Sequence, residues 1–112
     1  MDSSPSFVEA LRAGVLVFDG AMGTEIYRRH VFTNRCFDEL SLSDPKLIRD
    51  IHSEYCSAGA DVLTTNTFGA NRVALERYGL GEQRGAVVRA GARLAREVAA
   101  GAGRPVFVAG SI

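Results

Sequence analysis

The sequence predicts an α/β fold with parallel strands, and two observations lead to that prediction. Apolar runs rich in β-branched residues begin at residues 15, 61 and 106, and segments with helical periodicity lie between them. Such alternation is typical of parallel strands joined by helical crossovers, and the wide spacing leaves room for functional loops. The pattern fits either an open doubly wound sheet or a section of a (β/α)8 barrel. In the second case, 112 residues would hold only the first two to three βα units.

The chain is expected to begin with a short helix followed by a strand. Ser6 and Glu9 have the spacing of a capping box, and the apolar stripe that follows Ser6 ends at Gly14. Residues 15–18, with the sequence VLVF, are short, apolar and rich in β-formers. They are therefore expected to form a buried strand.

The clearest helix of the sequence follows Asp44. This residue is a good N-cap, and Pro45 fits the first helical turn because its missing N–H would have no partner there. His52 is expected on the outer or flanking side of the helix. Before this helix, residues 26–30 predict a brief helix, and residues 31–43 predict an irregular segment. The apolar face of the main helix is expected to contain Leu47, Ile48, Ile51, Tyr55 and Ala58.

The second half of the chain predicts two more strands and two helices. Residues 61–68 and 106–110 are expected to form the strands, residues 69–80 a short helix and residues 82–100 a longer one. The short helix is expected to bury Ala70, Val73, Ala74 and Tyr78, and the longer one Val87, Gly91, Leu94, Ala95 and Val98. The opposite, solvated face of the longer helix is expected to carry Arg84, Arg89, Arg93 and Arg96.

Composition argues against several classes of protein. The chain has 13 basic and 13 acidic residues and no block of like charge, which argues against a nucleic-acid partner. No apolar run approaches the roughly 20 residues of a membrane span, and the first residues lack the features of a secretory signal. Cys36 and Cys56 have neither metal-site nor redox spacing. We therefore expect a cytoplasmic protein that binds neither membranes nor nucleic acid.

Polar residues gather where the predicted strands end. Asp19 follows the first strand, Thr65, Asn66 and Thr67 close the second, and Ser111 follows the third. Sites in parallel α/β folds form at the carboxyl ends of the strands. The sequence therefore predicts a functional site at this edge.

The sequence DGAMGTE, which begins at Asp19, suggests how such a site could bind a zwitterion. The carboxylate could hold an ammonium group, and the glycines would let backbone N–H groups near Met22 and Gly23 receive a carboxylate. An ordinary structural role is equally compatible: Asp19 and Gly20 would form a tight turn, and Thr24 would cap the next helix. The segment is neither a dinucleotide fingerprint nor a P-loop, so no nucleotide site is expected.

Three sequence blocks, DGAMGTEIY, CFDELSLSDPKLIRDIHSEYCSAGADVLTTNTFGANRVALERYGL and VAGSI, occur between Val15 and Ile112. In this order they resemble the start of the homocysteine S-methyltransferase family. The resemblance implies a (β/α)8 barrel that transfers a methyl group to the sulfur of homocysteine and yields methionine. The short distance from DGAMGT to NRCFDEL looks most like a bifunctional branch, in which a methylenetetrahydrofolate reductase domain follows.

The resemblance also implies roles for the strand-end residues. In the family, the aspartate of the DG motif, here Asp19, helps to hold the amino group of homocysteine, and the amides just after it receive the carboxylate. The strand end TNTF, here residues 65–68, lines the mouth of the barrel. The predicted substrate-binding residues are Asp19, Gly20, Met22, Gly23, Thr65, Asn66, Thr67 and Ser111.

A zinc cofactor follows from the same resemblance. A thiol with a pKa near 8.5 is mostly protonated at neutral pH, and zinc converts it into a thiolate nucleophile. Family members hold Zn²⁺ through three cysteines whose positions would lie beyond Ile112. No metal ligand and no catalytic residue is therefore expected in this chain, and Cys36 and Cys56 are expected to be ordinary free thiols. FAD would be a further cofactor if a reductase domain follows.

Two interpretations of the whole chain remain. In the first, residues 1–14 are a capping helix segment and residues 15–112 are the truncated start of the homocysteine-binding domain, inactive alone. Its partners would be homocysteine and a methyl donor, either betaine, methylmethionine, methylfolate or methylcobalamin. In the second, the chain is a small stand-alone α/β binding or interaction domain, with Asp19 and Thr67 as turn and capping residues. A self-contained domain seldom stops on a bare parallel strand such as VAGSI, which favours the first.

Overall fold

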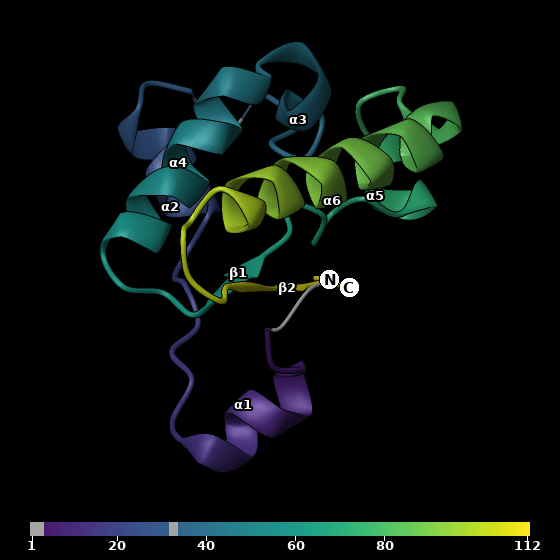
Figure 1. Cartoon of the computed structure of the whole chain (residues 1–112). Coiled ribbons are helices and arrows are strands. Elements are labelled where there is room, and N and C mark those ends of the chain that lie inside the picture. The colour runs from purple at the N-terminus through teal and green to yellow at the C-terminus, as the bar shows by residue number, and fades with distance from the viewer. Residues whose placement is uncertain (1–3, 32–33) are drawn as a thin grey trace.

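The computed structural model in Figure 1 describes residues 4–31 and 34–112. Two parallel strands, β1 (Val62–Thr64) and β2 (Phe107–Ala109), form the centre of the fold. They pair in register, with Leu63 opposite Val108. The helices between them carry the chain from the end of one strand to the start of the next. The predicted α/β fold with parallel strands is therefore confirmed.

The segment before the first loop runs beside β1, on the edge away from β2. Phe18 forms a parallel bridge to Val62, and the backbone N–H of Asp19 donates to the carbonyl of Val62 at 2.9 Å. The Asp61 carboxylate also accepts from the Val17 N–H, at 2.9 Å. Three chain segments therefore lie side by side, and their carboxyl ends point the same way.

Helices cover the strands. In Figure 1, α4 and α6 lie over one side of the strand pair, and α1 stands apart from the other helices on the opposite side. The Phe7 ring of α1 meets the Phe107 ring edge to face, with 5.5 Å between their centroids. The helices are α1 (Phe7–Ala13), α2 (Gly23–Arg28), α3 (Leu40–Ser43), α4 (Pro45–Ser57), α5 (Arg72–Glu76) and α6 (Arg84–Ala100), with a 3-10 turn η1 (Gly81–Gln83) before α6.

The predicted helix caps of α1 and α4 are present. Ser6 Oγ accepts from the Glu9 N–H at 3.1 Å, and the Glu9 carboxylate accepts from the Ser6 N–H, which completes the capping box. The Asp44 carboxylate accepts from the Leu47 N–H at 3.3 Å. These local signals set the starts of both helices, as the sequence indicated.

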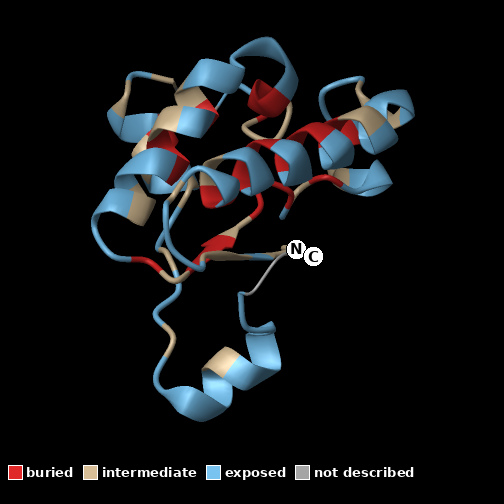
Figure 2. Ribbon diagram, in the orientation of Figure 1, coloured by how far each residue is buried: buried red, intermediate tan, exposed pale blue. Residues whose placement is uncertain are grey.

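Two groups of buried apolar residues stabilise the fold, one among the helices and one between the strands and α6. Figure 2 shows buried stretches in red on α4, on α6 and near β1. The helix cluster lies among α2, α3, α4 and α6, and the strand cluster lies between β1 and α6. Burying apolar side chains contributes most of the stability of such a fold. The helix cluster comprises Ile26, Leu40, Ile48, Ile51 and Leu94, and the strand cluster comprises Ala60, Leu63, Ala95 and Ala99.

Two predictions about the first half of the chain are wrong. Residues 15–18 were expected to form a buried strand. Among the described residues, however, the segment has a single β-bridge, at Phe18, and Val15 is 88% exposed. Among the described residues, this segment is bonded along one edge, to β1. The region expected to be irregular contains α3, where Leu40 packs into the helix cluster.

The expected faces of two helices also need correction. His52 is fully buried rather than on the outer side of α4, because it lies one turn after Ile48 on the same face. In the second half, α5 ends at Glu76 and buries Leu75, whereas Val73 is 74% exposed. The apolar face expected for a helix over residues 69–80 is therefore wrong for the shorter α5.

Candidate functional site

The predicted site residues come together at the carboxyl ends of the strands. They line one cavity of about 470 Å³, between the ends of β1 and β2 and the loop that leads into α2. Its lining contains every residue that the sequence predicted for the site: Asp19, Gly20, Met22, Gly23, Thr65, Asn66, Thr67 and Ser111. Segments 40 and more residues apart therefore meet at the edge where parallel α/β folds form their sites.

Asp19 is held in place by the end of β1. Its carboxylate accepts from the Thr64 backbone N–H at 2.9 Å and from the Thr64 hydroxyl at 2.8 Å. A carboxylate offers about four lone-pair positions, so two bonds to Thr64 leave capacity for a further donor. Asp19 is half-buried, which makes its remaining interactions stronger than those of a fully solvated carboxylate.

Thr65, Thr67 and Ser111 bond to one another. The two threonine hydroxyls lie 2.7 Å apart, Thr67 Oγ1 donates to the Ser111 carbonyl at 2.8 Å, and the Ser111 N–H donates to Thr65 Oγ1 at 3.1 Å. Both threonines are buried. This network ties the end of β1 to the chain that follows β2, so it fixes the floor of the cavity.

Two loops at the cavity wall are joined by reciprocal side-chain bonds. Asn66 Nδ2 donates to the Phe37 carbonyl at 2.9 Å, and the Asp38 carboxylate accepts from the Gly69 N–H at 2.9 Å. Asn66 also donates to Ser41 Oγ at 3.3 Å. Burial raises the pKa of the Asp38 carboxyl above its ordinary value. Each loop thus supplies a side chain to the backbone of the other.

The loop between Asp19 and α2 presents backbone to the cavity. Gly20, Met22 and Gly23 line it, and α2 begins at Gly23 with Met22 at the N-cap. Methionine has no side-chain oxygen for the first amides of the helix, so the alternative in which Thr24 caps this helix is not what the structure shows. Glycine at position 20 also permits close packing against α4, because a Cβ there would lie 2.9 Å from Tyr55 Oη.

The cavity combines negative charge with aromatic surface. Among the described lining residues, the charged ones are Asp19 and Asp38, both carboxylates. Aromatic rings of Phe18, Phe37 and Phe68 also line it. Such a lining favours a small ligand with a cationic group and an apolar portion.

A second hollow, of about 520 Å³, lies at the opposite end of the strands. It is lined by residues near the ends of α4 and α6, among them Ser57, Gly101 and Arg104. Arg104 is already engaged there, since it donates to the carbonyls of Cys56 and Ala60 at 2.7 and 3.0 Å. The strand-end residues are not part of this hollow, so we do not place the site in it.

The donor set for a metal is lacking in the described part of the chain. No three His, Cys, Asp or Glu side chains within residues 4–31 and 34–112 come together in an arrangement that could hold a metal ion. Cys36 is buried and Cys56 is half-buried, and both are free thiols. Burial raises the pKa of the Cys36 thiol, which disfavours the thiolate that a metal needs. These residues do not fit a zinc site.

Sequence reasoning missed several residues of the site. Thr64 orients Asp19 but lies one residue before the predicted strand-end group, and Asp38 comes from a loop with no strand signal. Tyr55 of α4 does not line the cavity, but its hydroxyl donates to the Ala21 carbonyl in the loop that leads into α2. Asp38 stands between Phe37 and Glu39 in the sequence, where no local pattern distinguishes it from an ordinary surface carboxylate.

Comparisons with known proteins identify a family and solved structures with a similar fold. A family model described as homocysteine S-methyltransferase matches residues 16–112. The metallated form of the homocysteine methyltransferase MmuM from Escherichia coli superposes with a TM-score of 0.77 at 30% identity, covering 92% of this chain and 39% of that one. The oxidized form of the same protein superposes with a TM-score of 0.73 at 28% identity, covering 87% of this chain and 37% of that one. The chain thus spans less than two fifths of the length of these structures.

In the described residues, no helix is both long and apolar enough to cross a membrane.

Proposed function

The chain belongs to the homocysteine S-methyltransferase family, and on that basis we propose that it forms part of the (β/α)8 barrel of an enzyme that methylates homocysteine to methionine. One observation carries the proposal: the Asp19 carboxylate and the backbone of the loop after it line the same strand-end cavity. A zwitterionic amino acid needs both kinds of group, one for its ammonium and one for its carboxylate.

The residues of this chain would bind and orient homocysteine. Asp19 would accept hydrogen bonds from the ammonium group, using the lone pairs that Thr64 leaves free. The backbone amides near Met22 and Gly23 would receive the carboxylate. Thr65, Asn66, Thr67 and Ser111 would maintain the cavity floor and wall, because their polar groups are largely engaged with one another and with neighbouring loops. Orientation of this kind can lower a barrier substantially.

We propose a zinc ion as the group that activates the homocysteine thiol, since a bound metal turns a thiol into a thiolate nucleophile near neutral pH. The solved relative is described in a metallated form, which supports a metal without identifying it. The described residues do not supply a ligand set, so the ligands would come from outside residues 15–112. The chain by itself is therefore expected to be inactive, with residues 1–14 serving as a capping helix segment.

A finer proposal concerns the whole protein. The spacing between DGAMGT and NRCFDEL supports the bifunctional branch, in which a methylenetetrahydrofolate reductase domain with FAD follows the methyltransferase domain. The enzyme would then act in one-carbon metabolism and methionine biosynthesis in the cytoplasm. Reading the gene beyond the codon for Ile112 tests this directly. Further βα units, an adjacent cysteine pair and a reductase domain are expected there.

The activity is tested by supplying the purified full-length protein with homocysteine and, in turn, betaine, S-methylmethionine, methyltetrahydrofolate or methylcobalamin. Methionine formation with one of these donors is the expected result, and removal of metal by a chelator should abolish it. Failure to form methionine with every donor, in protein that is folded and metal-loaded, would overturn the proposal.

A further inference from the structure

Tyr55 has a rigid position beneath the loop that leads into α2. It lies on α4, and its ring packs against both the helix cluster and the strand cluster. A ring held on two sides by core residues has little freedom to change rotamer. Its hydroxyl is therefore presented at a fixed point.

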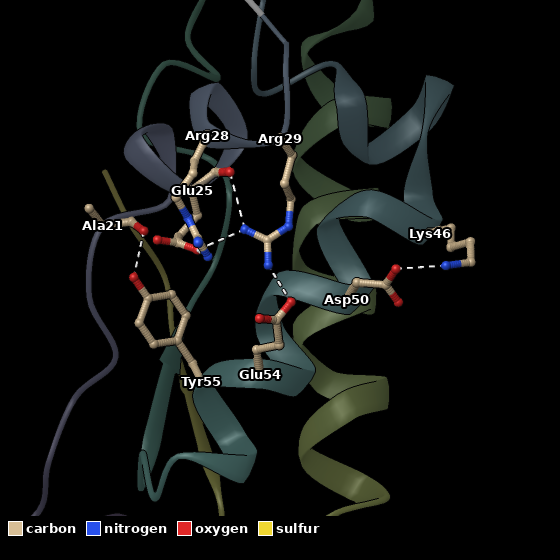
Figure 3. Close-up of polar contacts among 8 residues, drawn as sticks. All are labelled: Ala21, Glu25, Arg28, Arg29, Lys46, Asp50, Glu54 and Tyr55. Atoms are coloured by element: carbon tan, nitrogen blue, oxygen red, sulfur yellow. Dashed lines mark hydrogen bonds and ion pairs between the residues drawn. The ribbon is translucent and has the colours of Figure 1, made fainter.

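The hydroxyl of Tyr55 donates to the Ala21 carbonyl at 2.7 Å (Figure 3). The preceding residue lies against the same side chain, since a Cβ at Gly20 would be 2.9 Å from Tyr55 Oη and 3.2 Å from Cε1. A side chain at position 20 would push the loop away from the tyrosine. The glycine thus permits the close approach that the hydrogen bond requires.

The bond to Ala21 also sets the direction of the next amide. The peptide between Ala21 and Met22 is trans, so its C=O and N–H groups point in opposite directions. Because the carbonyl is drawn toward Tyr55, the Met22 N–H points away from α4. Met22 itself lines the cavity. The orientation of an amide proposed to receive the substrate carboxylate therefore depends on Tyr55.

A neighbouring contact provides a contrast. Glu54, the residue before Tyr55, accepts a hydrogen bond from Arg29, just after α2, and Arg29 also pairs with Glu25 at 2.7 Å (Figure 3). Adjacent residues of α4 thus hold α2 at its two ends. Only the Tyr55 contact reaches the part of the segment that lines the cavity.

We propose that Tyr55 is a positioning residue for substrate binding: its hydroxyl, acting through the Ala21 carbonyl, holds the loop from Asp19 to Gly23 in the conformation that receives the carboxylate of homocysteine. This inference rests on the proposed function and adds a residue that never touches the substrate. Burial, together with the negative charges of Glu25 and Asp19, raises the pKa of Tyr55, so the hydroxyl remains a donor throughout the physiological range.

The test uses the full-length protein with Tyr55→Phe, which removes the hydroxyl and keeps the ring. The loss of one hydrogen bond that fixes the loop is expected to raise the KM for homocysteine roughly three- to tenfold. The kcat at saturating homocysteine should stay within about twofold, because a loop that binds substrate and transition state alike affects KM. Glu54→Gln is the matched control on the same helix, and its KM should not change. An unchanged KM in Tyr55→Phe, or an equal rise in both variants, would overturn the inference.

A double-mutant cycle with Gly20→Ala gives an independent readout. The added methyl group collides with the Tyr55 hydroxyl, so Gly20→Ala should raise the KM more in the wild-type background than in the Tyr55→Phe background. Strictly additive effects would contradict a direct contact between the loop and this hydroxyl.

Hydrogen exchange of the unliganded protein separates this inference from the proposed function. Tyr55→Phe should accelerate exchange in peptides that cover residues 19–23, and Glu54→Gln should not. If Tyr55→Phe accelerates exchange but the wild-type protein methylates no homocysteine, the proposed function is refuted and the contact between Tyr55 and the loop is supported. Unchanged exchange in an active enzyme would refute the role of Tyr55 and keep the function.

Discussion

The Asp19 carboxylate receives two hydrogen bonds from a single residue, Thr64, one from its backbone N–H at 2.9 Å and one from its hydroxyl at 2.8 Å. Asp19 follows the bridge at Phe18, whereas Thr64 ends β1, so this contact joins segments that are 45 positions apart. The carboxylate is therefore oriented before any ligand arrives. Preorganisation of this kind reduces the entropy lost on binding.

Asp19→Asn should weaken homocysteine binding by the full-length enzyme while leaving its metal content unchanged. Asparagine is nearly isosteric and can still accept from the Thr64 N–H, so the strand end is preserved and only the charge is lost. The loss of a charge-assisted bond is expected to raise the KM for homocysteine roughly ten- to a hundredfold. Asp50→Asn, at an exposed pair with Lys46 on α4, is the control. An unchanged KM in Asp19→Asn would refute the role of this carboxylate.

Gly91→Ala should destabilise the protein because α6 approaches the strand end closely at this position. A Cβ there would lie 2.7 Å from Thr67 Cγ2 and 3.2 Å from the Asn66 carbonyl oxygen. Thr67 cannot turn away freely, since its hydroxyl is bonded to Ser111. We expect a loss of about 1–3 kcal/mol, seen as a lower Tm.

Gly85→Ala on the same helix is the matched control. A Cβ at position 85 would meet only the flexible end of the Arg89 side chain, at 3.2 Å. This substitution should be neutral or stabilising by up to about 1 kcal/mol, because alanine is the better helix former. Equal Tm changes in the two variants would contradict the close packing of α6 on the strand end.

Asp38→Asn should stabilise the protein at neutral pH, whereas Asp38→Ala should not. Burial raises the pKa of Asp38, so the folded state binds the carboxyl proton more tightly than the unfolded chain does. The stability that this group contributes through its proton is fully present below the pKa of about 3.9 that it has in the unfolded chain. That stability is lost as the pH rises through the pKa of the group in the folded protein. Asparagine avoids that loss and can still accept from the Gly69 N–H, which alanine cannot.

Thermal unfolding at pH 7 and pH 4 measures the effect of Asp38. The increase in Tm of Asp38→Asn over the wild type is expected to be smaller at pH 4 than at pH 7. Asp38→Ala should lower the Tm at both. A gain for Asp38→Asn that is as large at pH 4 as at pH 7 would show that ionisation of Asp38 is not responsible.

His52 should make stability sensitive to mild acid. It is fully buried, and neither ring nitrogen has a hydrogen-bond partner within the described residues. Burial lowers its pKa, against a smaller opposing effect of Asp19. The unfolded chain therefore takes up a proton below about pH 6.5, while the folded protein does so only at lower pH. Stability should consequently fall as the pH drops below that value.

His52→Leu is expected to remove this dependence, since leucine has a similar volume and no proton to bind. Denaturant unfolding at several pH values between 7.5 and 5.5 gives the free energy of unfolding as a function of pH. The slope of this free energy against pH should be steeper for the wild type than for the variant, by up to about 1.4 kcal/mol per pH unit. Parallel slopes would mean that His52 titrates equally in the folded and unfolded states.

The parts of the fold that local signals determine could be predicted from the sequence. The Ser6 and Asp44 caps act within one helical turn, and the alternation of strands and helices was enough to bring Asp19 and Ser111 to one edge. The expected outer or flanking position of His52 is wrong, because this residue lies one turn after Ile48 and shares its buried face.

Contacts that depend on packing between distant segments could not be predicted. The bonds from Asn66 to Phe37 and from Gly69 to Asp38 join two loops about 30 positions apart. The glycines after Asp19 predict that backbone N–H groups turn toward a ligand, but the sequence does not indicate that Tyr55 packs against Gly20 from α4. Sequence periodicity describes one element at a time, and these relationships appear only when the elements are packed together.

A crystal structure of the full-length protein with bound homocysteine tests the central claim most directly. We expect the amino nitrogen to lie about 2.7–2.9 Å from an Asp19 carboxylate oxygen, and the carboxylate to lie on the backbone amides near Met22 and Gly23. Homocysteine bound with its amino group away from Asp19, or in the hollow at the opposite end of the strands, would contradict the account.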